Sequence, residues 1–170
     1  MPGAFGGGKA VSSATGADAL VLFGGTGDLA RKKIYPALLA MARRGHLDIP
    51  VIAVARAPGD APTLRALVHD SLQQQRLLDD AAFAKLSPLL DYVRGDYGDV
   101  ATYDVLRRRL GSSVRPLYYL AIPPDAFPVV VAALGRMGGT EQARVVIEKP
   151  FGRDLESARS LNRTLHQVFR

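Results

Sequence analysis

The sequence predicts an α/β fold of the Rossmann type, a doubly wound and mainly parallel sheet with helices on both faces. Short apolar runs alternate with longer amphipathic stretches, and a glycine-rich turn directly follows the first apolar run. With 170 residues, 48% of them hydrophobic, the chain can form one compact domain with a substantial core. We therefore expect one domain over residues 18–170, preceded by a flexible tail over residues 1–17 that is rich in Gly, Ser and Ala.

Hydrophobic periodicity indicates five strands and six helices. The expected strands are Ala19–Phe23, Val51–Ala55, Leu89–Arg94, Pro116–Ala121 and Arg144–Ile147. The expected helices are Gly27–Arg44, Pro62–Arg76, Asp80–Lys85, Val100–Leu110, Pro124–Met137 and Asp154–Phe169. Pro36 lacks a backbone donor and should kink or break the first helix near Tyr35. Right-handed crossovers bring the carboxyl ends of the strands to one edge, and the residues expected there are Gly24, Arg56, Asp96, Pro123 and Lys149.

The turn from Gly24 to Ala30 is the first candidate site. Gly24 and Gly27, with Ala30 closing the pattern, let the backbone approach a pyrophosphate and let the helix pack closely on the strand. The amide groups and positive dipole end that open the helix favour phosphate binding. The alternative is a purely structural turn, but the strand before it and the helix after it favour a dinucleotide site.

Three segments then resemble glucose-6-phosphate dehydrogenase: residues 24–38, the Y-L-A-x-P-P segment Tyr119–Pro124, and the V-x-E-K-P-F-G-x-D-L segment Val146–Leu155. The resemblance covers about Ala19 to Phe169 and corresponds to the amino-terminal coenzyme domain of that family. It implies an oxidoreductase that oxidises glucose 6-phosphate at C1 with NADP⁺, at the entry to the pentose phosphate pathway.

The family's next motif, R-I-D-H-Y-L-G-K-E with its histidine base, does not occur in this sequence. We therefore expect the substrate and catalytic domain to be absent, so that this chain alone binds NADP and is inactive. The alternative is a stand-alone, non-catalytic module for NADP binding or protein interaction.

Arg56 favours NADP over NAD. It follows the strand Val51–Ala55, whose end normally meets the adenosine ribose, and NAD-binding domains usually place an acidic residue there. Residues 54–58 contain no carboxylate, whereas a guanidinium can pair with a ribose 2′-phosphate in two places. The alternative is an ordinary solvated arginine at a strand end.

The resemblance implies further contacts. It assigns Asp96 and Tyr97 to the adenine side, Tyr119 to the strand leading toward the nicotinamide, and Lys149 to both the cofactor and the sugar phosphate. It also implies a cis peptide before Pro150, whereas X-Pro bonds in general are mostly trans. Either tyrosine can equally fill core space. The turn residues expected at the cofactor are Gly24, Gly25, Thr26, Gly27, Asp28, Leu29, Ala30 and Arg31.

No residue of this chain is assigned a catalytic role. His46, His69 and His166 are the only histidines, and none is expected at a strand end near the nicotinamide. No Tyr-x-x-x-Lys pair, nucleophile elbow or metal-spaced His/Cys cluster occurs, so we expect no metal site. Asp28 is better placed to organise the phosphate loop than to abstract a proton.

Composition limits the partners. The net charge is +6, but no aromatic interleaving or recognised motif accompanies the basic clusters Arg31–Lys33 and Arg107–Arg109, so no specific nucleic-acid partner is expected. No apolar run is long enough for a membrane span, and the absence of cysteine suits a cytoplasmic protein.

The predicted terminal helix is the expected docking element. Asp154 is a good N-cap, and an apolar stripe must bury against something. We expect docking to a catalytic domain, or homo-oligomer formation, through helix 155–169. The stripe consists of Leu155, Ala158, Leu161, Leu165 and Val168.

Overall fold

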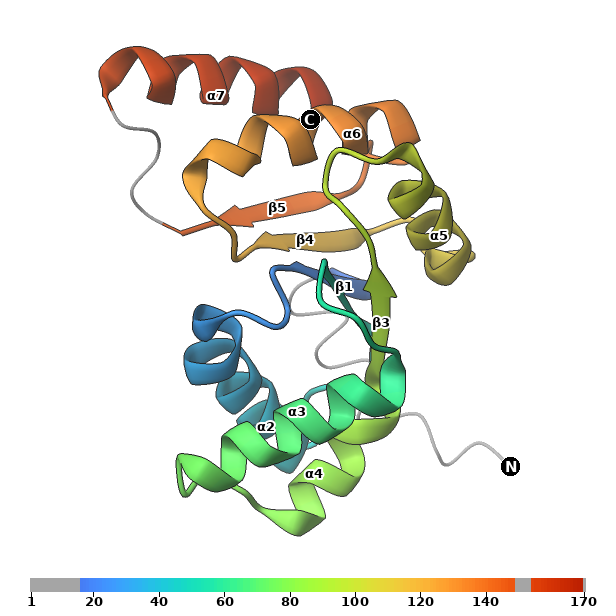
Figure 1. The fold of residues 1–170 in the computed structure, drawn as a ribbon. Coiled ribbons are helices and arrows are strands. Elements are labelled where there is room, and N and C mark those ends of the chain that lie inside the picture. Colours follow the sequence, from blue (N-terminus) through green and yellow to red (C-terminus); the bar gives the residue numbers. More distant parts are fainter. Residues whose placement is uncertain (1–15, 149–153, 170) are drawn as a thin grey trace.

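The structure is a computed structural model, and it describes residues 16–148 and 154–169 (Figure 1). The strands in these ranges are β1 Ala19–Phe23, β2 Val51–Ala55, β3 Leu90–Arg94, β4 Pro116–Leu120 and β5 Arg144–Ile147. The α-helices are α2 Tyr35–Arg43, α3 Ala61–Gln74, α4 Asp80–Leu86, α5 Val100–Leu110, α6 Phe127–Met137 and α7 Leu155–Val168. Shorter helical turns are the π-helix η1 Ala30–Ile34 and the 3₁₀ turns η2 Ser87–Leu89 and η3 Pro124–Ala126.

The five strands pair in parallel, in the order β3-β2-β1-β4-β5. The chain starts at the centre with β1, moves outward to β3 and then crosses to β4 on the other side of β1. The reversal creates a topological switch point between β1 and β4, and ligands of such sheets bind outside the carboxyl ends of the strands there. The predicted α/β fold is confirmed.

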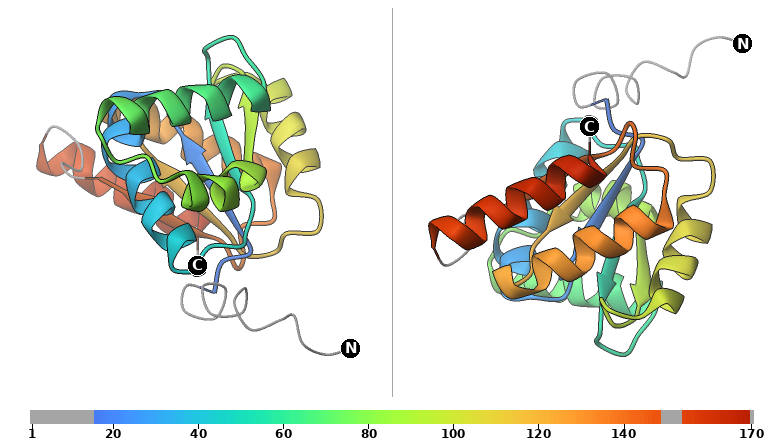
Figure 2. Two further views of the ribbon diagram at one scale, coloured as in Figure 1. Left: turned by 90° about the horizontal axis from the view of Figure 1, so that it is seen from below. Right: turned by 90° about the horizontal axis from the view of Figure 1, so that it is seen from above.

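Helices cover both faces of the sheet, with α2, α3 and α4 in one layer and α5, α6 and α7 in the other (Figure 2). Alternation along β1 supplies both cores: Leu20 and Leu22 face the first layer, whereas Val21 and Phe23 face the second. Both β1 and β2 are buried along their whole length, as is typical of central parallel strands. The sheet is therefore a rigid support for its carboxyl edge.

The helix after the glycine turn starts at Asp28 and ends at Arg43, but its hydrogen bonding changes on the way. In η1 the amide of Tyr35 donates to the carbonyl of Ala30, five residues earlier. The α-helical part then begins at Tyr35, with Pro36 in its first turn, where a missing N–H is tolerated. The helix is therefore not broken at Tyr35, and Pro36 coincides instead with a change of helix type.

Three boundaries differ from the sequence prediction, and prolines explain them. Leu89 belongs to the 3₁₀ turn η2, which contains Pro88, and not to β3. Ala121 lies beyond β4, since the prolines that follow cannot donate to a strand ladder. Pro124–Ala126 form a 3₁₀ turn ahead of α6. The other boundaries shift by one or two residues at most.

Residues near both ends of the described chain, Ala17 and those of α7, are more closely packed than expected from the sequence. Ala17, which we assigned to the tail, is 2% exposed and packs in the core. In α7, Leu161, Leu165 and Val168 pack against the core on the α6 side, and the capping box of Asp154 confirms the predicted N-cap. Within the apolar stripe, Leu161 is therefore buried in the domain, Leu165 and Val168 are partly buried, and Leu155 remains 66% exposed.

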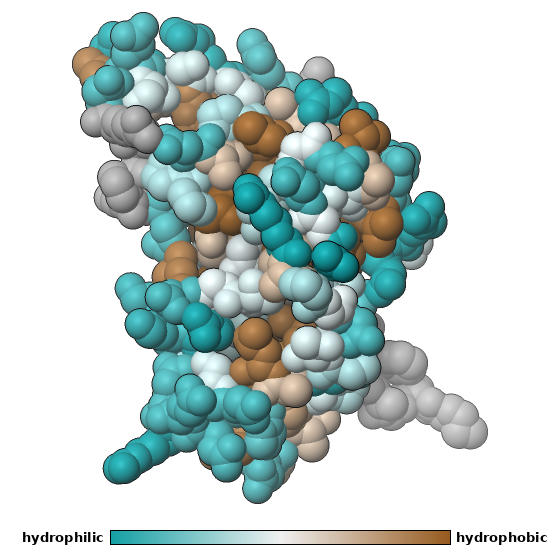
Figure 3. Space-filling model, in the orientation of Figure 1, coloured by the Kyte–Doolittle hydropathy of each residue, from teal (hydrophilic) through white to brown (hydrophobic). Residues whose placement is uncertain are grey.

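The surface in view in Figure 3 is mainly polar, with apolar residues in separate small patches. Within the described ranges, no helix is both long and apolar enough to cross a lipid bilayer. The large apolar side chains that are exposed are scattered, and they are Leu77, Val100, Val114, Val129, Val146 and Leu155. The face shown in Figure 3 therefore has no broad apolar area.

Asp18 ties the start of β1 to the loop before β4. Its carboxylate accepts hydrogen bonds from the Ser113 hydroxyl and from the amides of Val114 and Arg115. Partial burial raises the pKa of this carboxyl, but the hydrogen bonds outweigh burial and hold the pKa below its usual value. Asp18 therefore stabilises the fold above its unfolded-state pKa of about 4, and this contribution is lost as the pH falls through the folded-state pKa.

We expect Asp18→Asn to lower the free energy of unfolding by about 1 kcal/mol at neutral pH, since charge-assisted bonds are weakened at a partly exposed site. The difference in the free energy of unfolding between the two proteins should shrink on acidification, because the wild-type carboxyl becomes protonated. Urea unfolding of both proteins at about pH 7 and about pH 3 measures the difference. An equal cost at both pH values would contradict a role for the ionised carboxylate.

Candidate functional site

Gly24 begins the turn after β1, and its position admits no side chain. Its φ is +80°, and a Cβ there would lie 2.1 Å from the carbonyl oxygen of Ala121, just beyond β4. The amide of Gly24 donates to the carbonyl of Val54 at 2.9 Å. The turn is therefore held between the ends of β2 and β4, where the switch point lies.

The other small residues of the turn allow equally close packing. A Cβ on Gly25 would lie 2.4 Å from the Cβ of Ala53, and one on Gly27 would lie 3.3 Å from the carbonyl oxygen of Gly24. Ala30, the first residue of η1, is fully buried. These contacts bring the start of the helix close to the sheet, as the G-x-x-G spacing predicts.

The amides at the start of the helix form the phosphate-binding part of the candidate site. Thr26 is partly exposed, and its amide donates no hydrogen bond to any described residue. Asp28 and Leu29 follow as the first helical residues, and the carbonyls one turn earlier accept other donors. Gly24 accepts the Gly27 amide, and Gly25 accepts the Tyr35 hydroxyl. The Arg31 guanidinium pairs with the Asp28 carboxylate at 2.6 Å, so these two exposed charges offset each other.

Arg56 lies directly after β2, and its side chain is 68% exposed. Its guanidinium carbon is 5.6 Å from the centre of the Tyr97 ring, in cation–π geometry. Its Nε is 3.9 Å from the carboxylate of Asp96, too far for a hydrogen bond. This long ion pair uses one oxygen of the Asp96 carboxylate, while the other oxygen accepts the Gly98 amide at 2.8 Å. The guanidinium is thus held in place with donors that face solvent.

A cavity of ≈ 500 Å³ opens beside this arginine. Its lining brings together three of the residues predicted at the carboxyl edge, Arg56, Asp96 and Pro123, together with Tyr97. The rest of the lining was not assigned from the sequence. Gly98, Ala126 and Val129 carry no chemical signature, and Asp125 lies in the turn after Pro124, outside the motifs that predicted the site.

Tyr97 is mainly a supporting residue. Only 9% of it is exposed, and its ring packs edge-on against Phe23 with 5.9 Å between the ring centres. Burial raises the pKa of its hydroxyl, so the hydroxyl stays protonated at neutral pH. The core-filling alternative therefore applies to most of this ring, while its outer face carries Arg56.

Tyr119 lies on β4 and contacts the residue that follows the neighbouring strand, β5. Its hydroxyl donates to the carboxylate of Glu148, which follows β5. Burial and this carboxylate raise the pKa of Tyr119 to about 12. The sequence interpretation gave Glu148 no role of its own. Lys149 and the peptide before Pro150 lie outside the described residues.

The histidines lie away from the cavity at Arg56. His46 follows the end of α2, and His166 lies on α7. His69 lies on α3, with its ring 5.3 Å from that of Phe83. Among the described residues, no group of three or more His, Cys, Asp or Glu side chains is arranged to hold a metal ion.

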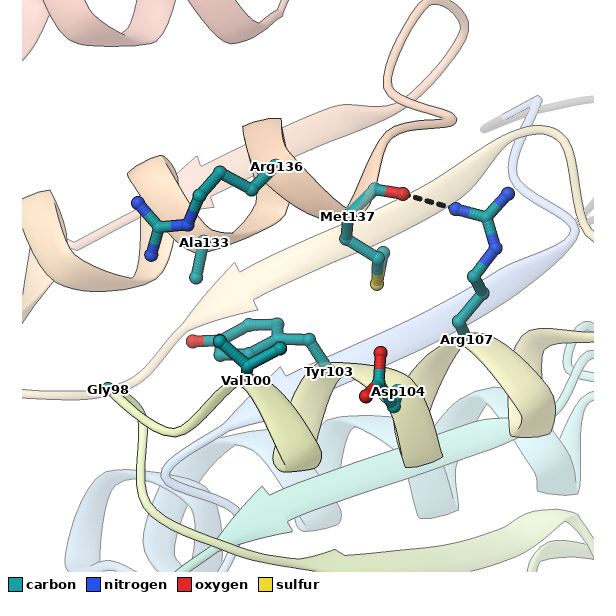
Figure 4. A pocket seen from close by; sticks show the side chains of 8 residues that line it. All are labelled: Gly98, Val100, Tyr103, Asp104, Arg107, Ala133, Arg136 and Met137. Carbon is teal, nitrogen blue, oxygen red and sulfur yellow. Dashed lines mark hydrogen bonds between the residues drawn. The ribbon is translucent and has the colours of Figure 1, made fainter.

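Two other cavities differ in chemistry. One of ≈ 190 Å³ lies between α5 and α6, where Arg107 and Arg136 flank Tyr103 (Figure 4). Arg107 donates to the carbonyl of Met137 and so caps α6. Another of ≈ 300 Å³ is lined almost wholly by apolar side chains between α2 and β4, with Lys33 at its margin. Neither combines a glycine turn with a strand-end cation.

A glycine turn that opens a helix, beside a cation at the end of the second strand and at the switch point of a parallel sheet, defines a dinucleotide-binding Rossmann domain. The sequence model of one family, "Glucose-6-phosphate dehydrogenase, NAD binding domain", matches residues 21–170. The chain belongs to this family.

Individual proteins similar to this chain are also glucose-6-phosphate dehydrogenases. Glucose-6-phosphate 1-dehydrogenase 1 of Mycobacterium tuberculosis is 43% identical over 151 residues, which are 89% of this chain and 32% of that protein. The crystal structure of the Mycobacterium avium enzyme matches with a TM-score of 0.85 and 42% identity, over 91% of this chain and 34% of that one. A glucose-6-phosphate dehydrogenase in complex with glucose 6-phosphate matches with a TM-score of 0.76 and 31% identity, over 90% and 35% of the two chains. This chain therefore spans about a third of the length of these relatives.

Proposed function

We propose that this domain binds NADP at the carboxyl edge of its sheet. The observation that carries the proposal is the position of Arg56 at the end of β2, supported on Tyr97 and facing the ≈ 500 Å³ cavity. A 2′-phosphate would pair with two guanidinium donors there, whereas the ribose hydroxyl of NAD offers no such anionic contact. One carboxylate oxygen of Asp96 accepts the Gly98 amide, and the other forms only a long ion pair of 3.9 Å with the Arg56 Nε.

The rest of the nucleotide follows from this position. The pyrophosphate would accept the Thr26 amide and the amides of Asp28 and Leu29, at the positive end of the helix dipole. The small residues of the turn would let the backbone come close to the pyrophosphate, and they are Gly24, Gly25, Gly27 and Ala30. The Arg31 guanidinium would offset the negative charge of the Asp28 carboxylate beside it. The adenine would lie in the cavity beside Asp96 and Tyr97, with the nicotinamide toward Tyr119 and Lys149.

NMR of the ¹⁵N-labelled chain tests this placement. On addition of NADP⁺ we expect the largest shifts at the amides of residues 26–29 and 96–98 and at the Arg56 Nε–H. NAD⁺ should shift the turn amides but leave the Arg56 side-chain signal nearly unchanged. Shifts confined to α4, or to the apolar cavity between α2 and β4, would contradict the proposed site.

We further propose that, within a full-length enzyme, the domain presents NADP⁺ for oxidation of glucose 6-phosphate at C1. Hydride would pass from C1 to the nicotinamide, a base would take the C1 hydroxyl proton, and the 6-phosphogluconolactone would form. The support is family membership and the solved relative whose title names glucose 6-phosphate as its substrate. Lys149, which lies outside the described residues, is the proposed contact to the sugar phosphate.

The 170-residue chain alone is expected to bind coenzyme without turning it over. No histidine lines the cavity at Arg56, and positioning a base and the sugar is a large part of catalysis. NADPH absorbance in mixtures of chain, glucose 6-phosphate and NADP⁺ should therefore stay at the level without protein. Turnover at ordinary enzymatic rates would contradict this prediction and show that the chain supplies its own base.

We also propose that helix 155–169 is a docking element. Docking of a catalytic domain, or of a second copy, through helix 155–169 is supported by the exposure of Leu155 at its start. A non-catalytic NADP-binding module remains the alternative function. Sedimentation velocity distinguishes monomer from oligomer, and fractionation of cells tests the predicted cytoplasmic location.

A further inference from the structure

Two buried tyrosines lie beneath the candidate site, and the proposed function assigns neither of them a role. Tyr35, at the start of α2, is fully buried, and Tyr92 on β3 is 6% exposed. Both belong to the core on the α2 side of the sheet. Each hydroxyl donates a hydrogen bond to a backbone carbonyl in a loop at the carboxyl edge of the sheet.

Tyr35 holds the glycine turn. Its hydroxyl donates to the carbonyl oxygen of Gly25 at 2.6 Å, entirely inside the fold. A peptide group is planar and trans, so the carbonyl of Gly25 and the amide of Thr26 point in opposite directions. Because Tyr35 holds the carbonyl inward, the Thr26 N–H points outward, toward the proposed pyrophosphate position.

Tyr92 holds the loop that carries Arg56. Its hydroxyl lies 2.5 Å from the carbonyl oxygen of Ala57 and 3.4 Å from that of Ala55. These carbonyls belong to the two residues on either side of Arg56. With both carbonyls directed toward Tyr92, the arginine side chain is left on the outer side of the loop, over Tyr97.

Both hydroxyls remain donors across the neutral pH range. Burial raises the pKa of Tyr35 and of Tyr92, so neither group ionises under ordinary conditions. Ionisation of the hydroxyls therefore removes neither bond in the neutral pH range.

We propose that Tyr35 and Tyr92 are positioning residues for coenzyme binding, with Tyr35 orienting the pyrophosphate-binding amide and Tyr92 orienting the arginine that binds the 2′-phosphate. The inference rests on the proposed function, since Tyr35 is assigned to the pyrophosphate of NADP and Tyr92 to its 2′-phosphate. Substitution of one tyrosine should therefore affect one part of the site and leave the other part unchanged.

The test uses three ligands and two variants of the full chain. NADP⁺ carries both the pyrophosphate and the 2′-phosphate, NAD⁺ carries only the pyrophosphate, and adenosine 2′-monophosphate carries only the 2′-phosphate. Tyr35→Phe should weaken NADP⁺ and NAD⁺ about five- to tenfold and leave adenosine 2′-monophosphate within twofold. Tyr92→Phe should weaken NADP⁺ and adenosine 2′-monophosphate by a similar factor and leave NAD⁺ within twofold.

Tyr118→Phe is the matched control. Tyr118 is fully buried on the other side of the sheet, and its hydroxyl has no hydrogen-bond partner among the described residues. Its removal should change the affinity of no ligand. The comparison of ligands within one variant also separates positioning from instability, because a partly unfolded preparation weakens all three ligands by one factor.

The outcomes are distinct. A uniform loss of affinity for all three ligands in Tyr35→Phe and Tyr92→Phe, or no loss in either, would overturn the inference while wild-type binding of NADP⁺ still supports the proposed function. Absence of NADP⁺ binding by the folded wild-type chain would overturn both.

Discussion

Arg56→Ala is expected to raise the dissociation constant for NADP⁺ about 10- to 100-fold and to change that for NAD⁺ less than threefold. A charge-assisted, two-point contact contributes roughly 1.5–3 kcal/mol, and each 1.4 kcal/mol is tenfold in affinity. The arginine is exposed and makes no hydrogen bond to a described residue, so its removal should hardly alter folding. Calorimetric titration with both nucleotides measures the two constants.

Two variants show whether the effect belongs to this arginine. Arg108→Ala removes the same charge from the exposed face of α5, and it should leave NADP⁺ affinity within twofold. Arg56→Lys keeps the charge but loses the planar guanidinium, so its affinity for NADP⁺ should lie between those of the wild-type chain and Arg56→Ala. If Arg108→Ala weakened NADP⁺ as much as Arg56→Ala, the preference would come from net charge, and the 2′-phosphate assignment would be wrong.

Gly24→Ala is expected to abolish detectable NADP⁺ binding and to destabilise the fold by about 3 kcal/mol or more. The new Cβ would lie 2.1 Å from the Ala121 carbonyl, at a φ of +80° that side chains rarely adopt. The clash is with backbone, so no rotamer change relieves it. The turn must move, and the amides that follow it move with it.

Gly45→Ala is the matched control for backbone conformation. Gly45 follows α2 with a φ of +72°, yet a Cβ there meets nothing within 4 Å. The same left-handed conformation should cost about 1 kcal/mol and leave coenzyme affinity unchanged. Thermal unfolding and NADP⁺ titration of both variants provide the comparison. Equal losses of stability at the two positions would show that the turn relaxes and that close approach is not required.

The coarse fold and the glycine turn were predictable because their causes are local. Continuous apolar runs predict buried parallel strands, and Gly24 and Gly27 after β1 predict the turn. Pro36 locates the irregularity of the first helix near Tyr35 for the same reason, because it removes one donor at a known position, although the helix changes type there and is not broken. Local chemistry also places Arg56 at the end of β2.

The supporting contacts were not predictable, since they join residues far apart in the sequence. The hydroxyl of Tyr92 reaches a carbonyl 35 residues away, and that of Tyr119 reaches Glu148, 29 residues away. A tyrosine in an apolar stretch gives no sign of which carbonyl it will meet. The roles of Tyr97 and Ala17 depend on tertiary packing in the same way. The sequence left open whether Tyr97 fills core space, and Ala17 is more buried than its assignment to the tail indicated.

The most direct measurement is a calorimetric titration of the wild-type chain with NADP⁺ and, separately, with NAD⁺ at physiological salt. We expect one NADP⁺ bound per chain and an affinity at least tenfold above that for NAD⁺, the equivalent of one charge-assisted contact. Equal affinities, or tighter binding of NAD⁺, would contradict the assignment of Arg56 to a 2′-phosphate. Absence of binding by the folded chain would contradict the coenzyme site itself.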